Sequence, residues 1–360
     1  MPDATRGMTR GGNYDAHDEY QRDVAATASQ LVAESIDAAA FPEPDATFVV
    51  ADYGAATGSN SIAATTSAAR AVRARRAGQP IAVLHNDLPT NDWNTLFANL
   101  AHTDDSYLAL DGGAALPLVS AISFFETSAP RGSVHLGLSS SAAHWLRHQP
   151  DVVVPEGFYF CEATGAARAA LDRAADDDWR AFLAARAADL AAGGRLIVQM
   201  VGTQPDPSGD LVTARGLLRA MAEVAHDMVE AGALDAGAVD RYVLAVYART
   251  PDEAGAPLTE PPLRAAFDVI ECRTDPVANP YFDTWQQDHD ADAYATAYAA
   301  FVRGFTESSL HTNLFTTGAI GASPDERLDE FFTRLRARFA SDPERDRFED
   351  WTLTVVLARR

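Results

Sequence analysis

One short stretch sets the architecture of this chain: Phe48-Val49-Val50-Ala51-Asp52-Tyr53-Gly54-Ala55-Ala56-Thr57-Gly58-Ser59-Asn60. It begins with an apolar run rich in β-branched residues, which is typical of a buried strand. The acid Asp52 stands near the end of this run, and a turn of small residues follows it. The pattern then becomes alanine-rich and helical as far as about Ala77. A strand, a tight turn and a helix in this order present backbone N–H groups and a positive helix end to a ligand. We therefore expect a nucleoside cofactor at the carboxyl ends of the strands.

The glycine spacing in the turn narrows the choice of ligand. A dinucleotide-binding turn has three glycines in the pattern Gly-x-Gly-x-x-Gly. The corresponding run here is Gly54-x-Ala56-x-x-Ser59, in which only the first glycine is present. Gly54 and Gly58 are four residues apart, as in the first motif of adenosylmethionine-dependent methyltransferases. On this stretch alone a methyltransferase, another nucleotide-binding protein and a purely structural turn all remain open.

Composition limits the class of protein. With 360 residues, 47% of them hydrophobic, the chain can form one large domain or a domain with a substantial insertion. A net charge of −22 repels phosphate backbones, so we expect no nucleic-acid partner. Cys161 and Cys272 have no metal-type spacing, and residues 1–9 show no secretory signal. Because no apolar run is long enough to span a membrane, we expect a cytoplasmic enzyme. A homodimer is one assembly that the sequence allows.

Strands and helices alternate through the first half of the chain, which predicts a parallel sheet covered by helices. A helix is expected from Asp15 to about Ala40, before the first strand. A helix opening at Asp178-Trp179 is expected to end at Gly193-Gly194. Further strands are expected at 81–87, 106–110, 133–138 and 195–200.

The second half is mainly helical. One long helix is expected over 210–231, and 284–340 is mostly helical, with a capping box at Ser323-Pro324-Asp325-Glu326. Two late strands, at 267–272 and 351–357, would complete the sheet. We therefore expect one α/β unit over 1–360 with a helical cap above the carboxyl edge of the sheet. The sheet core would take approximately 40–150, 180–205, 265–275 and 350–360, and the cap and substrate pocket 1–40, 151–180, 206–264 and 284–340.

Five stretches, in order, resemble the motifs of the SABATH carboxyl methyltransferases, which methylate small acids such as salicylate, benzoate, jasmonate and fatty acids. The most specific is the third, which nearly repeats the family's Asn-Asp-Leu-Pro-x-Asn-Asp-Phe-Asn. The resemblance runs from residue 8 to about 275 and more loosely to the end. The five stretches are Gly11–Gln21, Val50–Asn60, Asn86-Asp87-Leu88-Pro89-Thr90-Asn91-Asp92-Trp93-Asn94, Ser139-Ser140-Ser141-Ala142-Ala143-His144-Trp145-Leu146, and Phe182–Arg195.

The resemblance implies a Rossmann-like class I methyltransferase sheet, mostly parallel with its last strand antiparallel. It also implies S-adenosyl-L-methionine as cofactor and a small carboxylic acid as substrate. Because a carboxylic acid with a pKa of about 4 to 4.5 is already ionised at pH 7, the reaction needs no general base. Orientation and exclusion of water would supply catalysis. No metal is needed for this chemistry.

Residue roles follow from the same resemblance, position by position. Asp87 would bind both ribose hydroxyls, since a carboxylate accepts two O–H bonds in a forked geometry. Asp18 stands where family members often have Ser, and would hold the amino group of the cofactor. Gln21 and Trp145 would hold the substrate carboxylate as the catalytic pair. The full set of cofactor residues is Tyr14, Asp18, Asp52, Gly54, Asn60, Asp87, Leu88, Ser123, Phe124 and Ser139, and the substrate residues are Gln21, His144, Trp145, Phe158 and Tyr159.

Each of these residues also has a purely structural interpretation. Taken alone, Trp145 is more often a core residue, Gln21 is an exposed helix residue, and Asp52 and Asp87 are helix-capping acids. Their joint placement in matched motifs favours the functional interpretation. Phe124, Phe125 and Phe158-Tyr159-Phe160 would line an apolar cavity, which favours a medium-chain fatty acid and then a benzoate-type acid.

Three other functions are open at this stage. One is an N-methyltransferase acting on a small heterocycle, which would lack the carboxylate clamp. A second is a catalytically silent protein that binds an adenosine cofactor. The third is a dehydrogenase, which the incomplete glycine pattern disfavours.

Overall fold

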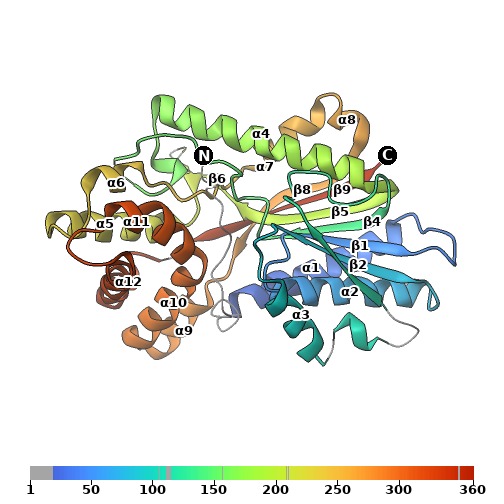
Figure 1. Ribbon diagram of the computed structural model, residues 1–360, viewed down its shortest axis with the longest axis horizontal. Coiled ribbons are helices and arrows are strands. Elements are labelled where there is room, and N and C mark those ends of the chain that lie inside the picture. Colours follow the sequence, from blue (N-terminus) through green and yellow to red (C-terminus); the bar gives the residue numbers. More distant parts are fainter. Residues whose placement is uncertain are drawn as a thin grey trace.

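The computed structural model describes residues 19–104, 106–110, 115–155, 157–207, 209, 211–347 and 349–360. In these residues a twisted sheet lies between two layers of helices, and a separate group of helices lies beyond one edge of the sheet (Figure 1). Within the described residues, no helix combines the length and apolar character needed to cross a membrane.

The main sheet has seven strands in the order β3-β2-β1-β4-β5-β9-β8. The first five are parallel to one another, whereas β9 is antiparallel to both β5 and β8. This confirms the expected class I methyltransferase topology with an antiparallel late strand. The strands are β1 (Phe48–Tyr53), β2 (Ile81–Asp87), β3 (Ala115–Ala121), β4 (Val134–Ser140), β5 (Leu190–Gly202), β8 (Phe267–Val277) and β9 (Asp350–Arg359), with a small hairpin of β6 (Gln204–Pro205) and β7 (Leu211–Val212).

Each face of the sheet buries its apolar side chains under helices. On one face, α1, α2 and α3 pack over a core that includes Ile36, Val50 and Val72. On the other face, α4, α7 and α8 cover a core that includes Tyr53 and Leu196. The elements of these two layers are α1 (Glu19–Ala38), α2 (Ser59–Arg75), α3 (Trp93–His102), η2 (Tyr107–Ala109), α4 (Gly165–Asp189), α7 (Pro251–Gly255), η4 (Ala256–Thr259) and α8 (Leu263–Ala266).

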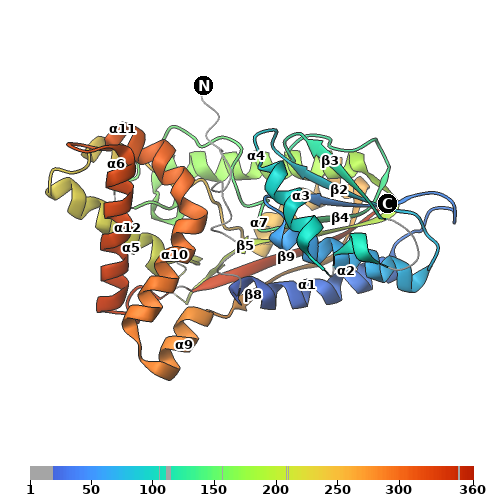
Figure 2. The same ribbon diagram turned by 60° about the horizontal axis from the view of Figure 1, so that its bottom comes forward.

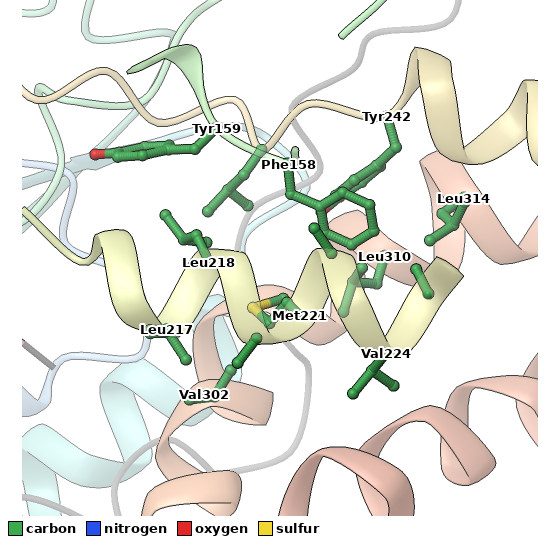
Figure 3. Close-up of a cluster of buried hydrophobic side chains, with 14 of the residues drawn as sticks. Phe158, Tyr159, Leu217, Leu218, Met221, Val224, Tyr242, Val302, Leu310 and Leu314 are labelled. Carbon is green, nitrogen blue, oxygen red and sulfur yellow. The ribbon is translucent and has the colours of Figure 1, made fainter. Parts of the chain in front are cut away.

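The remaining helices lie beyond the carboxyl ends of the parallel strands, as Figures 1 and 2 show. They enclose a third apolar core, which includes Leu218 and Met221 of α5 together with Phe158, Tyr159 and Tyr242 (Figure 3). The expected capping box of Ser323 and Glu326 is confirmed at the start of α12. These elements are η3 (Phe160–Glu162), α5 (Arg215–Glu230), α6 (Ala236–Arg241), α9 (Pro280–Asp288), α10 (Ala291–Leu310), the π-helical η5 (His311–Phe315), α11 (Thr316–Gly318) and α12 (Pro324–Ser341).

Helix α4 joins the two parts of the molecule. Its first half packs Leu171 and Ala175 into the core of the helical group. Its second half packs Trp179 and Phe182 against the sheet. The helix begins at Gly165, not at the predicted Asp178. Its first half is rich in alanine, which favours a helix through propensity without giving an amphipathic stripe.

The predicted third strand was wrong. Residues Ser106–Leu110 contain the 3₁₀ turn η2, and the strand lies later, at Ala115–Ala121. Tyr107 is buried like a strand residue, but it lies in this turn, where its hydroxyl is hydrogen-bonded to His85 of β2. The true strand carries Pro117 and has no regular alternation of buried and exposed residues, because it forms the edge of the sheet.

Candidate active site

The turn after β1 is held against the end of β2 by backbone hydrogen bonds. The N–H groups of Gly54 and Ala55 both donate to the carbonyl of Asn86, at 2.9 and 3.1 Å. Gly54 has φ +100°, and a Cβ there would lie 2.3 Å from the Cβ of Ala142 in the segment after β4. Glycine is needed at this position because both the backbone angle and the close approach exclude a side chain. The turn therefore meets the ends of β2 and β4 at one place.

Asp87, the last residue of β2, is fixed by that same turn. Its Oδ2 accepts a hydrogen bond from the N–H of Ala56 at 2.8 Å, and its Oδ1 accepts one from the N–H of Leu88 at 2.7 Å. Burial raises the pKa of Asp87, and these two bonds oppose that rise. An ionised carboxylate has about four acceptor sites. Two are used by the backbone, so about two remain for a diol such as a ribose.

Asp52 lies beneath the turn and is almost completely buried. Burial raises its pKa to about 6; a hydrogen bond from Ser61 lowers it, and the charge of Asp87 raises it further. The Ser61 hydroxyl is 2.9 Å from Nδ1 of His85, whose Nε2 is 2.8 Å from the Tyr107 hydroxyl. Burial lowers the pKa of His85 to about 4, so this ring is neutral near pH 7. Ser61, His85 and Tyr107 therefore form a buried hydrogen-bonded chain that ends at the Asp52 carboxylate.

The loop that carries Ser123 and Phe124 approaches the same turn. Phe124 has its Cε1 3.9 Å from the position that a Cβ on Gly54 would occupy. Arg186 of α4, itself fully buried, holds the loop by donating to the carbonyls of Phe124 (2.6 Å) and Glu126 (2.8 Å). Leu88 is half-buried at the end of β2. Contact of Ser123, Phe124 and Leu88 with an adenine ring stays a prediction.

His144 and Trp145 follow β4, shortly after Ala142, whose side chain lies against Gly54. Trp145 forms an isolated antiparallel bridge with Val246 and is only partly buried, packed against the apolar core of the helical group. Nδ1 of His144 accepts a hydrogen bond from the N–H of Val201 at 3.1 Å. Burial, followed by the charge of Arg249, lowers the pKa of His144 to about 3. The imidazole is therefore neutral, with its proton on Nε2.

Three of the predicted site residues have well-defined structural contacts. The Ser139 hydroxyl donates to the carbonyl of Tyr53 at 2.8 Å and so ties β4 to β1. Phe158 is buried against Tyr242, with ring centroids 4.7 Å apart, in the core drawn in Figure 3. Tyr159 is equally buried. Their direct contacts with cofactor or substrate stay predictions.

Four predicted residues cannot be placed in the same detail. Tyr14 and Asp18 lie outside the described residues. Gln21 lies in α1 and Asn60 in the first turn of α2, but neither side chain is among those that the structure describes.

Two buried arginines beside the site were given no role by the sequence reasoning. Arg186 belongs to the fifth matched stretch, and its position one turn after Phe182 was the available signal. It pairs with Asp189 at 2.8 Å, with both side chains fully buried. Arg249 has no comparable signal, because its partners come from distant segments.

The sheet order and the acid at the end of β2 define an S-adenosylmethionine-dependent methyltransferase of class I, and the comparisons name its family. Residues 5–360 match the model of the SAM-dependent carboxyl methyltransferases, and the chain belongs to this family. The O-methyltransferase acrG of Aspergillus aculeatus is 29% identical over 329 residues, covering 87% of this chain and 85% of that protein. The salicylate carboxymethyltransferase of Clarkia breweri is 24% identical over 216 residues, 58% of each chain. The solved structure of loganic acid methyltransferase with SAH aligns over 98% of both chains, with a TM-score of 0.77 and 19% identity, and so shares the fold.

The predicted family, enzyme class and cofactor are thereby confirmed. The protein is a SAM-dependent carboxyl O-methyltransferase. The residues present fit the cofactor, because Asp87 keeps acceptor sites for a diol beside the turn at Gly54.

Proposed function

We propose that the protein methylates the carboxylate of a small lipophilic monocarboxylic acid, with a medium-chain fatty acid as the first candidate and a benzoate-type acid as the second. The observation that carries this proposal is the position of Trp145. It follows β4 beside the turn of β1, and it packs on the apolar core of the helical group while remaining partly exposed. An acceptor hydrogen-bonded to its indole N–H would therefore have apolar surroundings.

The relatives support an acid as acceptor. Their names specify salicylate, gibberellic acid, loganic acid and indole-3-acetate, which differ in skeleton and share a carboxyl group. These names support the class of acceptor without selecting one acid. The apolar environment of Trp145 is what favours a lipophilic skeleton.

The reaction mainly requires the protein to hold the two reactants in the correct relative position. S-adenosylmethionine supplies a methyl group that is already activated by its sulfonium charge. The acceptor is ionised near pH 7, so proton removal is not required. Asp87 and the Gly54 turn would fix the adenosine, and Trp145 and Gln21 would orient a carboxylate oxygen towards the methyl group. His144 is neutral with Nδ1 occupied, so it serves as a hydrogen-bond donor rather than as a base.

A screen of free acids with radiolabelled S-adenosylmethionine tests the proposal. The panel contains C6 to C14 fatty acids, benzoate and salicylate, with the matching amides, amines and a xanthine as controls. We expect methyl ester only from the acids, and the highest kcat/KM among the lipophilic ones. Turnover restricted to an amine or a purine would overturn the assignment of the acceptor.

A further inference from the structure

Asp52 and His85 point to the same face of the sheet. They are paired in register on the parallel strands β1 and β2. Paired residues of adjacent strands lie on one face, and the residues two positions earlier, Val50 and Val83, belong to the core under α2. Ser61, in the first turn of α2, contacts both side chains from this face. Asp52 and His85 therefore share one hydroxyl group.

The hydrogen-bonded chain that includes this hydroxyl is buried along its whole length. Ser61 bonds the Asp52 carboxylate and lies 2.9 Å from Nδ1 of His85, and Nε2 of His85 lies 2.8 Å from the Tyr107 hydroxyl. The rings of His85 and Tyr107 also stack, with centroids 5.9 Å apart. All four residues are at most 5% exposed. The protons in the chain therefore come from its own members.

A count of these protons gives the direction of each hydrogen bond. Ionised Asp52 can only accept, and Ser61 and Tyr107 have one hydroxyl proton each. Burial lowers the pKa of His85 to about 4, so near pH 7 its neutral ring has one protonated nitrogen. Ser61 must then donate to Asp52 and accept from Nδ1–H of His85, which leaves Nε2 to accept from Tyr107. Three donors in a row therefore point towards Asp52.

This alignment stabilises the ionised form of Asp52. A buried carboxylate is unfavourable unless hydrogen-bond donors compensate for its lost hydration. Among the described residues, the charge of Asp87 also acts on Asp52, and it opposes ionisation. The donors act in the opposite sense, because each bond of such a chain polarises the next. A His85 ring protonated on Nε2 would require Ser61 to donate to Nδ1, and Asp52 would lose its donor.

We propose that His85 and Tyr107 are positioning residues of the cofactor site, which act through Ser61 to keep Asp52 ionised for the positive charge of S-adenosylmethionine. In this arrangement His85 is held as the Nδ1–H tautomer. The role does not depend on which acid is methylated. It does depend on the predicted place of Asp52 beside the cofactor, for which Asp52→Asn is a separate test.

Nitrogen-15 NMR of the histidine-labelled full-length protein identifies the tautomer. The chain has nine histidines, and the signals of His85 are those absent from the spectrum of His85→Asn. At about pH 7.5, with and without S-adenosylmethionine, we expect a proton on Nδ1 and none on Nε2. A proton on Nε2 would overturn the proposal, because Ser61 would then donate to His85 rather than to Asp52.

Cofactor affinity at two pH values tests whether this tautomer matters for binding. His85→Leu and His85→Asn are a matched pair, because the two side chains have similar size and only the amide can donate to Ser61 in place of Nδ1. Without that donor, ionised Asp52 is less stable, so the midpoint of the pH dependence in His85→Leu should rise by about 0.5 to 1 pH unit. We expect calorimetric affinity to be about 2- to 5-fold weaker at about pH 6 and changed by less than about 1.5-fold at about pH 8, with His85→Asn near the wild-type values.

A purely structural histidine predicts a different pattern. Both variants would then weaken binding by similar factors at the two pH values, and that result overturns the proposal. A pH dependence that survives in Asp52→Asn would show that another group responds to the cofactor, and would overturn the predicted place of Asp52. The two failures are therefore distinguishable.

Tyr107→Phe keeps the proposal testable if the His85 variants do not fold. This change removes one oxygen and keeps a ring beside His85. Without the hydroxyl donor to Nε2, the Nε2–H tautomer of His85 becomes more populated. The midpoint for cofactor binding should therefore rise as in His85→Leu, by less than about 0.5 pH unit. An unchanged tautomer together with an unchanged midpoint would contradict the role assigned to Tyr107.

Discussion

The Asp87 carboxylate accepts a hydrogen bond from the N–H of Ala56 at 2.8 Å, so the acid at the end of β2 and the turn after β1 form one rigid surface. The bond joins residues that are 31 positions apart in the chain. It leaves the carboxylate oriented before any ligand arrives. Pre-orientation of this kind reduces the entropy that binding must overcome.

Replacing Asp87 with Ala tests its role on the ribose. We expect the affinity for S-adenosylmethionine to fall by about 1.5–3 kcal/mol, the range for hydrogen bonds to a charged group. Isothermal titration calorimetry gives the affinity directly. Asp87→Asn is the matched control, because it keeps the size of the side chain and loses one acceptor. Unchanged affinity in both variants would refute the assignment.

Gly54 is predicted to tolerate no side chain. Gly54→Ala places a Cβ 2.3 Å from that of Ala142 at φ +100°, and this overlap has to push the turn at Gly54 away from the segment that follows β4. We expect a loss of about 2–3 kcal/mol in the free energy of unfolding, together with weaker cofactor binding. Gly78→Ala is the control, since a Cβ there meets nothing within 4 Å and should change stability by less than about 0.5 kcal/mol. Equal Tm values for the two variants would contradict the prediction, because the turn would then accommodate a side chain at residue 54.

The pair of Arg186 and Asp189 is predicted to be the strongest single support of the loop that carries Ser123 and Phe124. Both side chains are fully buried, and Arg186 also holds the carbonyl of Phe124. Asp189→Asn leaves a buried cation without its partner, which costs about 3–5 kcal/mol of stability. Glu260→Gln breaks an ion pair with Arg180 at 3.0 Å that is largely exposed, and should cost less than about 1 kcal/mol. Denaturant unfolding of both variants compares the two losses, and similar values would contradict the prediction.

Asp52 predicts that cofactor binding depends on pH. Its pKa is raised to about 6 in the folded chain, so between about pH 4 and 6 the folded state holds more protons than the unfolded state. The sign follows from this: the Asp52 contribution makes stability fall as pH rises through that window. A cofactor with a positive sulfonium favours the ionised acid, so its affinity should rise between about pH 5 and 7 with release of a proton.

Calorimetry in buffers of different ionisation enthalpy counts that proton. Asp52→Asn removes the titrating group and should flatten the pH dependence of the affinity. Asp87→Asn keeps the titrating Asp52 and removes a charge that raises its pKa, so it should keep the pH dependence and move it to lower pH. A slope that survives in Asp52→Asn would assign the proton to another group.

The sequence predicted the parts of this site that depend on local pattern. The strand at Phe48, the turn at Gly54 and the acid at Asp87 are each encoded within a few residues, and the matched motifs placed them together. The sequence could not show why residue 54 must be glycine, because a side chain there would collide with the Cβ of Ala142, 88 residues away. Arg249 was missed for the same reason, since its partners are carbonyls from two distant segments. The edge strand β3 was missed because its apolar and polar residues do not alternate regularly.

The last prediction concerns the two residues proposed to hold the substrate carboxylate, Gln21 and Trp145. Gln21 belongs to α1 and Trp145 follows β4, so the proposed pair would join the N-terminal helix to the carboxyl edge of the sheet. Each neutral N–H donor to a carboxylate contributes roughly 1.5–3 kcal/mol, or about 10- to 100-fold in kcat/KM. Neither is proposed to touch the adenosine, so cofactor affinity should stay at the wild-type value.

Trp145→Phe is the cleaner substitution, because the phenyl ring keeps most of the packing against the apolar core and only the N–H donor is lost. At the second position, Gln21→Ala removes the donor, and Gln21→Glu should be worse still because it sets a carboxylate against a carboxylate. Steady-state kinetics on the acid identified by the screen, with calorimetry of the cofactor as the control, measures both variants. Since the two donors act on one carboxylate, the double variant should lose less than the product of the single losses. If Trp145→Phe and Gln21→Ala each keep near wild-type kcat/KM, the carboxylate is held elsewhere, and the family motif no longer identifies the acceptor in this chain.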